Sequence, residues 1–393
     1  MSTCALCGTS LDAATVVGTR GRYSPELINV CCSTCGLVQQ RPRPSQADLD
    51  AWYASGAYRA ERDPLPMRHS SGALVMPGSP EYDEARLGLG RNRAALIVEA
   101  LGLTADDDVL EIGCADGHVA SGLGERDIGV WGWEPDETQR EKALERGVLV
   151  LDEAPVVEGY GEFFNAIYSL HVVEHYADPV AELAKLRTLL RPGGKLFLEC
   201  PNVLMPYGDL DDWFFEAAHV TSFSVQTLIA VARRVGFKPI WVRETLSLFV
   251  GFGMCDPDPD YMPGQPASEV VATLSEYRET SAARQAQESA AEVARAFVDG
   301  ASVAELGEGG EALLRDAIKL LGAQGFAAMQ AYNRCMHDIG AMCELLDREV
   351  SVAADEWHKD SWQWGRVCGR AELAAQAGHM LGHAANAWKL LDR

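Results

Sequence analysis

The stretch "VLEIGCADGHVASGLGERDIGVWGWEPDE", residues 109–137, decides the fold of this chain. It predicts a short apolar strand, a glycine turn, a helix and a second apolar strand that ends in an acid, which together make a nucleotide-binding β-α-β unit. Gly113 and Gly117 allow the backbone to approach a ligand closely, and Glu134 stands where a carboxylate can accept hydrogen bonds from both ribose hydroxyls. The spacing is E-x-G-x-x-x-G instead of the G-x-G-x-x-G of a pyrophosphate binder, so it favours a cofactor without a diphosphate.

The segments that follow extend this unit into an α/β domain. "GVLVLDEA" contains a strand that ends at Asp152, and "FNAIYSLHVVEH" contains an apolar strand that runs to His171. "DPVAELAKLRTLL" has apolar residues at helical spacing, with Asp178 as the N-cap and Pro179 in the first turn. "LRPGGKLFLECPN" then ends this helix and adds a further strand, so strands and helices alternate as in a parallel sheet covered by helices.

A motif of zinc peptidases lies within the same region. His171, Glu174 and His175 stand in the order H-x-x-E-H, which supplies two zinc ligands when the whole stretch is helical. Here the strand runs to His171 and the helix begins only near Asp178. The two histidines therefore do not share a long helix face, and the peptidase interpretation fails.

From about Arg93 to Arg243 the chain resembles the class I S-adenosylmethionine-dependent methyltransferases. The resemblance rests on "VEHYADP", "LRPGGKLFLECPN" and "HVTSFSVQTLIAVARRVGF", which occur in the family's order after the glycine turn. It implies a Rossmann-like fold and S-adenosylmethionine as the cofactor. Carried over to this chain, it places residues around the methionine part (Glu111, Gly113, Cys114, Gly117), on the ribose (Glu134), near the adenine (Asp152) and beside the sulfonium (Ser169, Leu170, His171).

The first part of the chain contains two copies of the sequence C-x-x-C-G. They are "CALCG", with Cys4 and Cys7, and "CSTCG", with Cys32 and Cys35. Two such knuckles bring four thiolates to one tetrahedral ion, and a site without a vacant position is structural, so we expect one structural Zn²⁺ here. Cys31 stands beside this set without the required spacing.

The zinc module together with "AWYASGAYRAE" resembles bacterial sugar C-methyltransferases and related tailoring enzymes. This resemblance places Tyr53 and Tyr58 over the cofactor and makes His175, His219 and Glu216 the candidate catalytic residues. "FFEAAHVTSFS" has Ala218 where the sugar enzymes have glutamate, so methylation of carbon, nitrogen and oxygen all stay open. The acceptor is expected to be a small molecule or a glycan in a biosynthetic pathway, with proton removal assisted by histidine.

Beyond a Pro/Asp/Gly-rich linker at residues 255–266, the composition becomes alanine-rich and amphipathic. A stripe of apolar residues between Leu313 and Val350 predicts a C-terminal helical domain that closes the acceptor pocket or forms a homo-oligomer interface. The predicted domains are thus a zinc-binding module (1–60), a methyltransferase domain (61–254) and a helical domain (255–393).

Composition limits the partners that the chain can have. A formal net charge of −23 without a local basic patch disfavours nucleic acid as a partner. No apolar run is long enough to cross a membrane, and the start lacks a signal-peptide pattern, so we expect a cytoplasmic protein that does not bind membranes. The alternative to an enzyme is a zinc-containing interaction protein with a vestigial methyltransferase core.

Overall fold

The computed structural model describes residues 3–281, apart from residues 23, 61–66, 69–73, 152–153, 155–158 and 265. The described residues belong to one compact unit within residues 1–282. The predicted stripe between Leu313 and Val350 and the adenine contact of Asp152 therefore lie outside the described residues. Within the part of the chain that is described, no helix combines the length and the apolar character that crossing a membrane requires.

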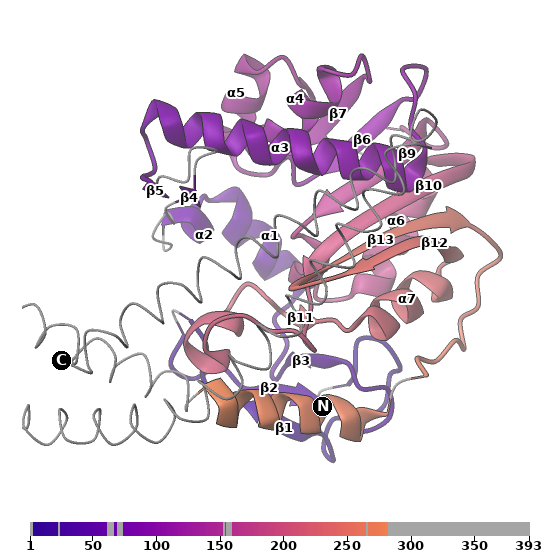
Figure 1. The fold of residues 1–393 in the computed structure, drawn as a ribbon. Helices are drawn as coiled ribbons and strands as arrows, with labels where there is room; N and C mark the ends of the chain where they lie inside the picture. Colours follow the sequence, from indigo (N-terminus) through magenta and orange to yellow (C-terminus); the bar gives the residue numbers. More distant parts are fainter. Residues whose placement is uncertain are drawn as a thin grey trace, which may run out of the picture. The chain divides into compact units, whose positions relative to one another are not determined.

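A seven-stranded mixed sheet forms the centre of this unit (Figure 1). Five neighbouring strands run parallel, and one strand lies antiparallel between the fifth of them and the edge strand. In spatial order the strands are β12 (Phe237–Glu244), β13 (Ser247–Met254), β10 (Leu190–Pro201), β9 (Phe164–Leu170), β6 (Val109–Ile112), β7 (Val130–Trp133) and β8 (Leu149–Val150). The chain begins this sheet with β6, adds β7 and β8 on one side of it, and then adds β9 and β10 on its other side. This reversal creates a topological switch point between β6 and β9.

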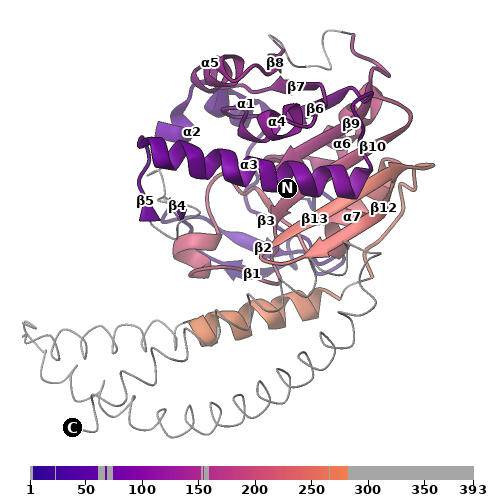
Figure 2. The ribbon, with the colours of Figure 1, turned by 45° about the horizontal axis from the view of Figure 1, so that its top comes forward.

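Helices cover both faces of this sheet, because alternate residues of the central strands are buried on opposite sides. Val109 and Ala166 pack with α3 and α4, whereas Leu110 and Ile167 belong to the core under α6 and α7. Figure 2 shows α3 and α4 together on the near side of the sheet. The Rossmann-like core that the sequence predicts is confirmed. The helices are α3 (Pro80–Leu101), α4 (His118–Gly124), α5 (Glu137–Glu145), α6 (Pro179–Leu189) and α7 (Val225–Arg234).

The segment with the H-x-x-E-H motif folds as predicted. Strand β9 ends at Leu170, a short 3-10 helix, η1 (Val173–His175), follows, and α6 begins at Pro179. The side chain of Asp178 caps α6 by accepting a hydrogen bond from Ala181 N. The two histidines of the motif therefore lie on separate elements, and the exclusion of a helical peptidase site is confirmed.

A second, four-stranded sheet lies at the base of the unit in Figure 1. Its first three strands come from the N-terminal part of the chain, but its fourth strand, β11, comes from the part that also forms the seven-stranded sheet. Thr221 of β11 pairs with Gln39 of β3 in antiparallel register. The N-terminal part is thus joined to the core by main-chain hydrogen bonds. The strands are β1 (Thr15–Gly18), β2 (Asn29–Cys31), β3 (Val38–Gln40) and β11 (Thr221–Ser222).

Short elements connect the two sheets. Helices α1 (Gln46–Ala54) and α2 (Ala57–Ala60) follow β3, and a small hairpin of β4 (Met67–Arg68) and β5 (Leu74–Val75) precedes α3. Between β10 and β11 the chain forms a π-helical turn, η2 (Leu210–Phe214).

The residues after the predicted linker begin a helix that spans at least residues 267–281. Val270 and Leu274 are buried in one cluster with Val17 and Val38 of the N-terminal sheet. This first part of the predicted C-terminal domain therefore packs within the same unit.

Candidate functional site

The glycine turn after β6 lies at the switch point of the sheet. Gly113 has φ +74°, and a Cβ atom at this position would come within 2.6 Å of Val172 Cγ2. Gly117 also has φ +74°, and its Cβ would lie 2.8 Å from Val148 Cγ2. Only glycine combines this left-handed conformation with this close packing, so the turn keeps the backbone close to the carboxyl ends of the strands.

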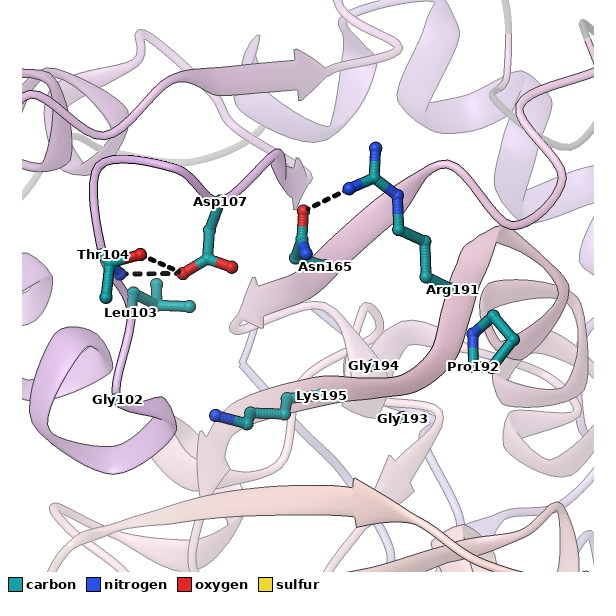
Figure 3. A pocket seen from close by; sticks show the side chains of 10 residues that line it. All are labelled: Gly102, Leu103, Thr104, Asp107, Asn165, Arg191, Pro192, Gly193, Gly194 and Lys195. Carbon is teal, nitrogen blue, oxygen red and sulfur yellow. Dashed lines mark hydrogen bonds between the residues drawn. The ribbon is translucent and has the colours of Figure 1, made fainter.

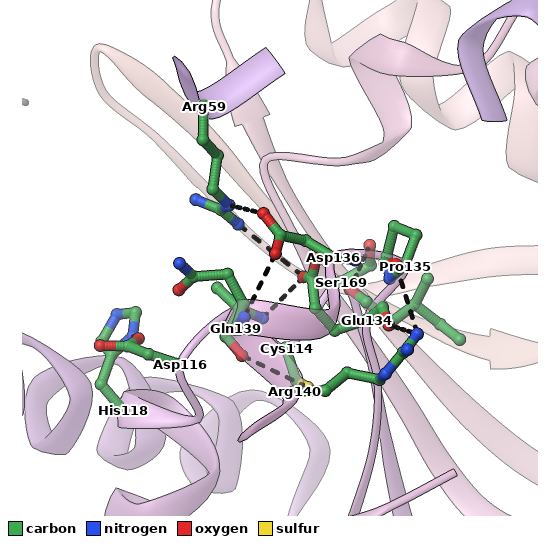
Figure 4. A network of polar contacts seen from close by, with 12 residues as sticks. Arg59, Cys114, Asp116, His118, Glu134, Pro135, Asp136, Gln139, Arg140 and Ser169 are labelled. Carbon is green, nitrogen blue, oxygen red and sulfur yellow. Dashed lines mark hydrogen bonds and ion pairs between the residues drawn. The ribbon is translucent and has the colours of Figure 1, made fainter. Parts of the chain in front are cut away.

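Glu134 follows β7 and is held in place beside this turn (Figure 4). Its Oε2 accepts a hydrogen bond of 2.9 Å from Ala115 N, and its Oε1 accepts one of 3.1 Å from Asp136 N. Glu134 is only 5% exposed, and its burial raises the pKa of its carboxyl. A buried carboxylate with both oxygens on backbone donors is fixed beside the switch point of the sheet, which is where ligands bind in folds of this kind.

Arg59 of α2 approaches the carboxylates of Glu134 and Asp136 from above in Figure 4. Its Nε lies 3.3 Å from Asp136 Oδ2, and its Nη2 lies 3.9 Å from Glu134 Oε2. Asp136 also caps α5 through Gln139 N. The sequence analysis missed Arg59 and Asp136. The N-cap position of Asp136 was a usable signal, whereas nothing local connects α2 with β7.

Glu111, Cys114 and Ser169 lie deeper in the same region, and all three are buried. Glu111 accepts a hydrogen bond of 2.8 Å from the hydroxyl of Tyr168, and burial raises the pKa of its carboxyl to about 8. Ser169 Oγ donates to Ile112 O over 3.4 Å, and Leu170 is partly buried at the end of β9. The residues expected around the methionine part and the sulfonium are therefore gathered at the ends of β6 and β9.

Asp116, within the glycine turn, binds two arginines and a histidine. Arg86 holds it with two hydrogen bonds of 2.7 and 3.1 Å, Arg146 Nη2 lies 3.3 Å away, and His118 Nδ1 lies 2.8 Å away. Burial alone would raise the pKa of Asp116, but these partners hold it well below its usual range. The cluster ties α3 and α5 to the turn, and the sequence analysis assigned it no role.

His175 of η1, which follows β9, lies next to His219. Their ring centroids are 5.5 Å apart, and Tyr53 of α1 stacks on His175 at 5.4 Å with nearly parallel planes. Tyr58 approaches the same imidazole edge-on at 5.7 Å. The structure thus brings together the two predicted histidines and both predicted tyrosines, which come from three distant parts of the sequence.

Glu216 completes this group. Its Oε1 lies 2.7 Å from Nε2 of His219, and both residues are buried. Because a carboxylate can only accept a hydrogen bond, this contact favours the neutral tautomer that has its proton on Nε2 and leaves Nδ1 as the acceptor. This is the arrangement of a carboxylate–histidine pair in which the carboxylate fixes the tautomer of the imidazole.

A second acidic group surrounds His171, just beyond the end of β9. Glu174 Oε1 and Glu199 Oε1 each lie 3.2 Å from a ring nitrogen of His171, and Arg93 Nη2 lies 2.7 Å from Glu199 Oε1. Burial alone would lower the pKa of His171, but its two carboxylate partners outweigh this effect and raise it to about 10. Neither Glu174 Oε2 nor Glu199 Oε2, both buried, has a hydrogen-bond partner among the described residues.

Glu199 and Arg93 were not identified from the sequence. The available signal for Glu199 was a single acid in the otherwise apolar strand "LFLEC", because a charged side chain in a buried strand needs a partner. Arg93 is separated from it by more than a hundred positions, and no local pattern connects them.

The four knuckle cysteines lie together in the N-terminal part. Cys4 Sγ is 3.5 Å from Cys35 Sγ, and Cys7 Sγ is 3.6 Å from Cys32 Sγ. Ligands about 2.3 Å from a tetrahedral zinc are spaced by roughly 3.8 Å, so these sulfurs suit such an ion. Cys31 Sγ instead approaches Gly36 O and Ala267 O.

One further group in the described part of the chain has metal-ligand character. Glu174, His175 and His219 each place one ligand atom within 4.8 Å of the others. A carboxylate and two imidazoles are also the groups of acid–base chemistry, and the 2.7 Å contact between His219 and Glu216 favours that use.

A pocket of about 380 Å³ lies elsewhere, at the amino ends of β9 and β10 (Figure 3). Asn165 and Arg191 form part of its wall and share a hydrogen bond of 3.0 Å. None of the candidate site residues lines this pocket. It is therefore separate from the crevice at the carboxyl ends of the strands.

Comparisons with known proteins identify the central domain. Residues 82–241 match a protein family described as "Methyltransferase domain". The "Ubiquinone biosynthesis O-methyltransferase" of Aeromonas salmonicida is 29% identical over 102 residues, which cover 24% of this chain and 43% of that protein. The protein of the same name from Histophilus somni is 30% identical over 116 residues, which cover 26% of this chain and 48% of that protein. The chain thus spans less than half the length of these relatives.

A solved structure of 1,6-didemethyltoxoflavin-N1-methyltransferase from Burkholderia thailandensis, with bound 1,6-didemethyltoxoflavin and S-adenosylhomocysteine, is also similar. It has a TM-score of 0.40 and 16% sequence identity, and the likeness covers 58% of this chain and 96% of that one. At these values the likeness carries no argument about function. The family match and the sheet topology together support a Rossmann-like methyltransferase core.

Proposed function

We propose that this protein transfers the methyl group of S-adenosylmethionine to a hydroxyl group of a small molecule or glycan. The observation that supports the proposal most is that two groups of candidate residues lie next to the ends of neighbouring strands, β6 and β9. Glu134 accepts a hydrogen bond from the turn after β6, and His219 of the Glu216–His219 pair stacks on His175 of η1, which follows β9. A cofactor at the turn would present its sulfur to an acceptor beside the histidines.

The residues of the crevice fit such a cofactor. The left-handed Gly113 and Gly117 keep side chains out of the turn, and Glu134 offers a fixed carboxylate to two ribose hydroxyls. Ser169 and Leu170 end β9, and His171 follows them directly. Bound S-adenosylmethionine supplies an electrophilic methyl group on a sulfonium, so the chain itself has to bind, orient and deprotonate the acceptor.

The Glu216–His219 pair is suited to remove the acceptor's proton. With Nε2 donating to Glu216, Nδ1 of His219 is available to take a proton from a hydroxyl, and Glu216 stabilises the imidazolium that forms. Such a base contributes roughly two to four orders of magnitude to the rate. His175, between Tyr53 and His219, orients the acceptor and helps to exclude water.

Oxygen is the acceptor atom that we favour. The two curated relatives are named as O-methyltransferases, and Ala218 stands where the similar sugar C-methyltransferases have a glutamate. A hydroxyl needs one base of moderate strength, which the histidine supplies, whereas a carbon acid needs more. Buried glutamates and aromatic rings around the acceptor side suit a ligand rich in hydroxyl groups.

We further propose that Cys4, Cys7, Cys32 and Cys35 bind one structural Zn²⁺. The support is the close packing of four sulfurs on two alike knuckles, in which Gly8 and Gly36 are left-handed. With four protein ligands no position is vacant for substrate, so the ion stabilises the N-terminal sheet and has no part in the chemistry.

The test is methyl transfer from tritium-labelled S-adenosylmethionine to a panel of sugars and phenols, with amines included. Label is expected in a hydroxyl-bearing acceptor, and His219→Asn and Glu216→Gln should each lower the rate by at least a hundredfold. Glu125→Gln, on the surface beside Arg91, is the matched control and should keep full activity. Label found only on amines, or activity that survives in both variants, would contradict the proposal.

A further inference from the structure

The loop that carries Glu216 and His219 is fastened to the N-terminal sheet by its main chain. It joins η2 to β11 and comprises residues 215–220. Phe215 O accepts a hydrogen bond of 2.7 Å from Arg22 N, and Val220 O accepts one of 2.9 Å from Gln40 N. Both ends of the loop are therefore set by the N-terminal part of the chain.

The side chain of Gln40 holds the middle of the same loop. Its Nε2 lies 3.1 Å from Glu216 O, 3.0 Å from Ala217 O and 3.1 Å from His219 O. One amide nitrogen has two hydrogens, so three such contacts require that a hydrogen be shared. Ala218 O is the remaining carbonyl of the loop, and it accepts from Val220 N within the loop.

Burial makes this contact specific. Gln40 is 4% exposed, so its amide nitrogen has the loop carbonyls in place of water. Without Gln40, Ala217 O and His219 O would lose this donor, whereas Glu216 O would still accept from His219 N. The three contacts fix the peptide units that follow Glu216, Ala217 and His219, and so set the backbone between the two residues of the Glu216–His219 pair. A change of an ångström in this backbone would separate two side-chain atoms that now lie 2.7 Å apart.

We infer that Gln40 of the cysteine-bearing N-terminal module is a positioning residue for the Glu216–His219 pair, so that this module forms part of the acceptor side of the site. The role in catalysis rests on the proposed function, whereas the positioning itself does not. In this view the module does more than stabilise the fold, because it supplies the donors that shape the loop.

The neighbouring residue provides a matched control. Gln39 is also a buried glutamine of β3, but its side chain serves the first knuckle, where Oε1 accepts from Ala5 N over 2.8 Å and Nε2 donates to Thr3 O over 3.4 Å. Gln39→Met therefore removes a glutamine from the same strand without removing a donor from the loop.

The experiment compares Gln40→Met with Gln39→Met in the full chain. Amide hydrogen exchange at residues 215–222 should rise at least tenfold in Gln40→Met and stay within twofold in Gln39→Met. The ¹⁵N and ¹H resonances of the His219 ring should shift in Gln40→Met alone. Affinity for S-adenosylhomocysteine should stay within twofold in both variants, because the glycine turn is not touched.

Unchanged exchange and unchanged His219 resonances in Gln40→Met would overturn the inference, and so would equal effects of the two substitutions. If Gln40→Met does not fold, Gln40→Asn serves instead, since it keeps the donors but is one methylene too short to reach all three carbonyls. If the unsubstituted protein does not bind S-adenosylhomocysteine, the proposed function is contradicted. The positioning test, which reads amide exchange and the His219 resonances, is unaffected by that result.

Discussion

Nε2 of His219 lies 2.7 Å from Oε1 of Glu216, and the two residues are three positions apart in a buried loop. The contact favours the tautomer with the proton on Nε2, because a carboxylate can only accept a hydrogen bond. It therefore leaves Nδ1 as the basic nitrogen of a site that otherwise contains mainly carboxylates and aromatic rings. The proposed deprotonation of the acceptor depends on this relationship.

Removal of the ribose-binding carboxylate should weaken cofactor binding. Glu134→Ala is expected to raise the Kd for S-adenosylhomocysteine by about tenfold or more, since charge-assisted hydrogen bonds are worth roughly 1.5–3 kcal/mol each at most. Isothermal titration calorimetry measures the change, with Glu125→Ala as a surface control. An unchanged Kd in Glu134→Ala would remove this residue from the site.

Metal analysis of cysteine variants tests whether Cys32 or its neighbour Cys31 binds the zinc. Cys32→Ser should lose the bound zinc, because Cys32 Sγ lies with the other knuckle sulfurs, whereas Cys31→Ser should keep one zinc per chain. Cys31 Sγ approaches backbone carbonyls instead. Retention of zinc by Cys32→Ser together with its loss from Cys31→Ser would reverse the assignment.

The turn at Gly113 should tolerate no larger residue. Gly113→Ala forces a side chain into a left-handed conformation, which costs about 1–2 kcal/mol, and directs its Cβ at Val172. We expect a lower melting temperature and weaker S-adenosylhomocysteine binding. Gly124→Ala is the control, because this glycine is not left-handed and its Cβ would meet nothing within 4 Å. Equal stability of the two variants would argue against a strained turn.

Burial of Glu111 predicts a pH dependence of stability. Its pKa is raised from 4.5 to about 8 in the folded protein, so between these values the folded state keeps a proton that the unfolded state loses. The free energy of unfolding should therefore fall as pH rises from about 4.5 to 8, by at most roughly 1.4 kcal/mol per pH unit, and this contribution should be constant above that range.

Glu111→Gln keeps an oxygen for the hydroxyl of Tyr168 and cannot ionise. Denaturant unfolding at pH 5, 6.5 and 8 should therefore show a smaller loss of stability with rising pH in this variant than in the unsubstituted chain. Parallel pH profiles would mean that Glu111 is ionised in the folded protein.

Local signals made much of the core predictable. The glycine turn at Gly113 and the N-cap at Asp178 depend only on residues close to them in the sequence. The sequence therefore predicted the β-α-β unit and the start of α6 correctly. Local strand and helix signals also showed that the H-x-x-E-H motif lies at a strand end. Its exclusion as a peptidase site required only that the strand and the helix be recognised.

Contacts between distant segments were not predictable in this way. The pairing of β3 with β11, the three contacts of Gln40 and the ion pair of Arg93 with Glu199 each join residues more than a hundred positions apart. No periodicity or spacing encodes them, because they arise when separate buried surfaces meet. The histidines of the acceptor side were found through family resemblance, but the support of their loop by the N-terminal sheet was not.

The central claim is that the crevice beside the glycine turn binds S-adenosylmethionine, and calorimetric titration of the full chain with S-adenosylhomocysteine tests it most directly. We predict binding of one molecule per chain with a Kd below about 100 μM, since the product shares every contact of the cofactor except those of the methyl group and the sulfonium charge. The absence of binding at high micromolar concentrations of both S-adenosylhomocysteine and S-adenosylmethionine would contradict the account and would favour an interaction protein with a vestigial methyltransferase core.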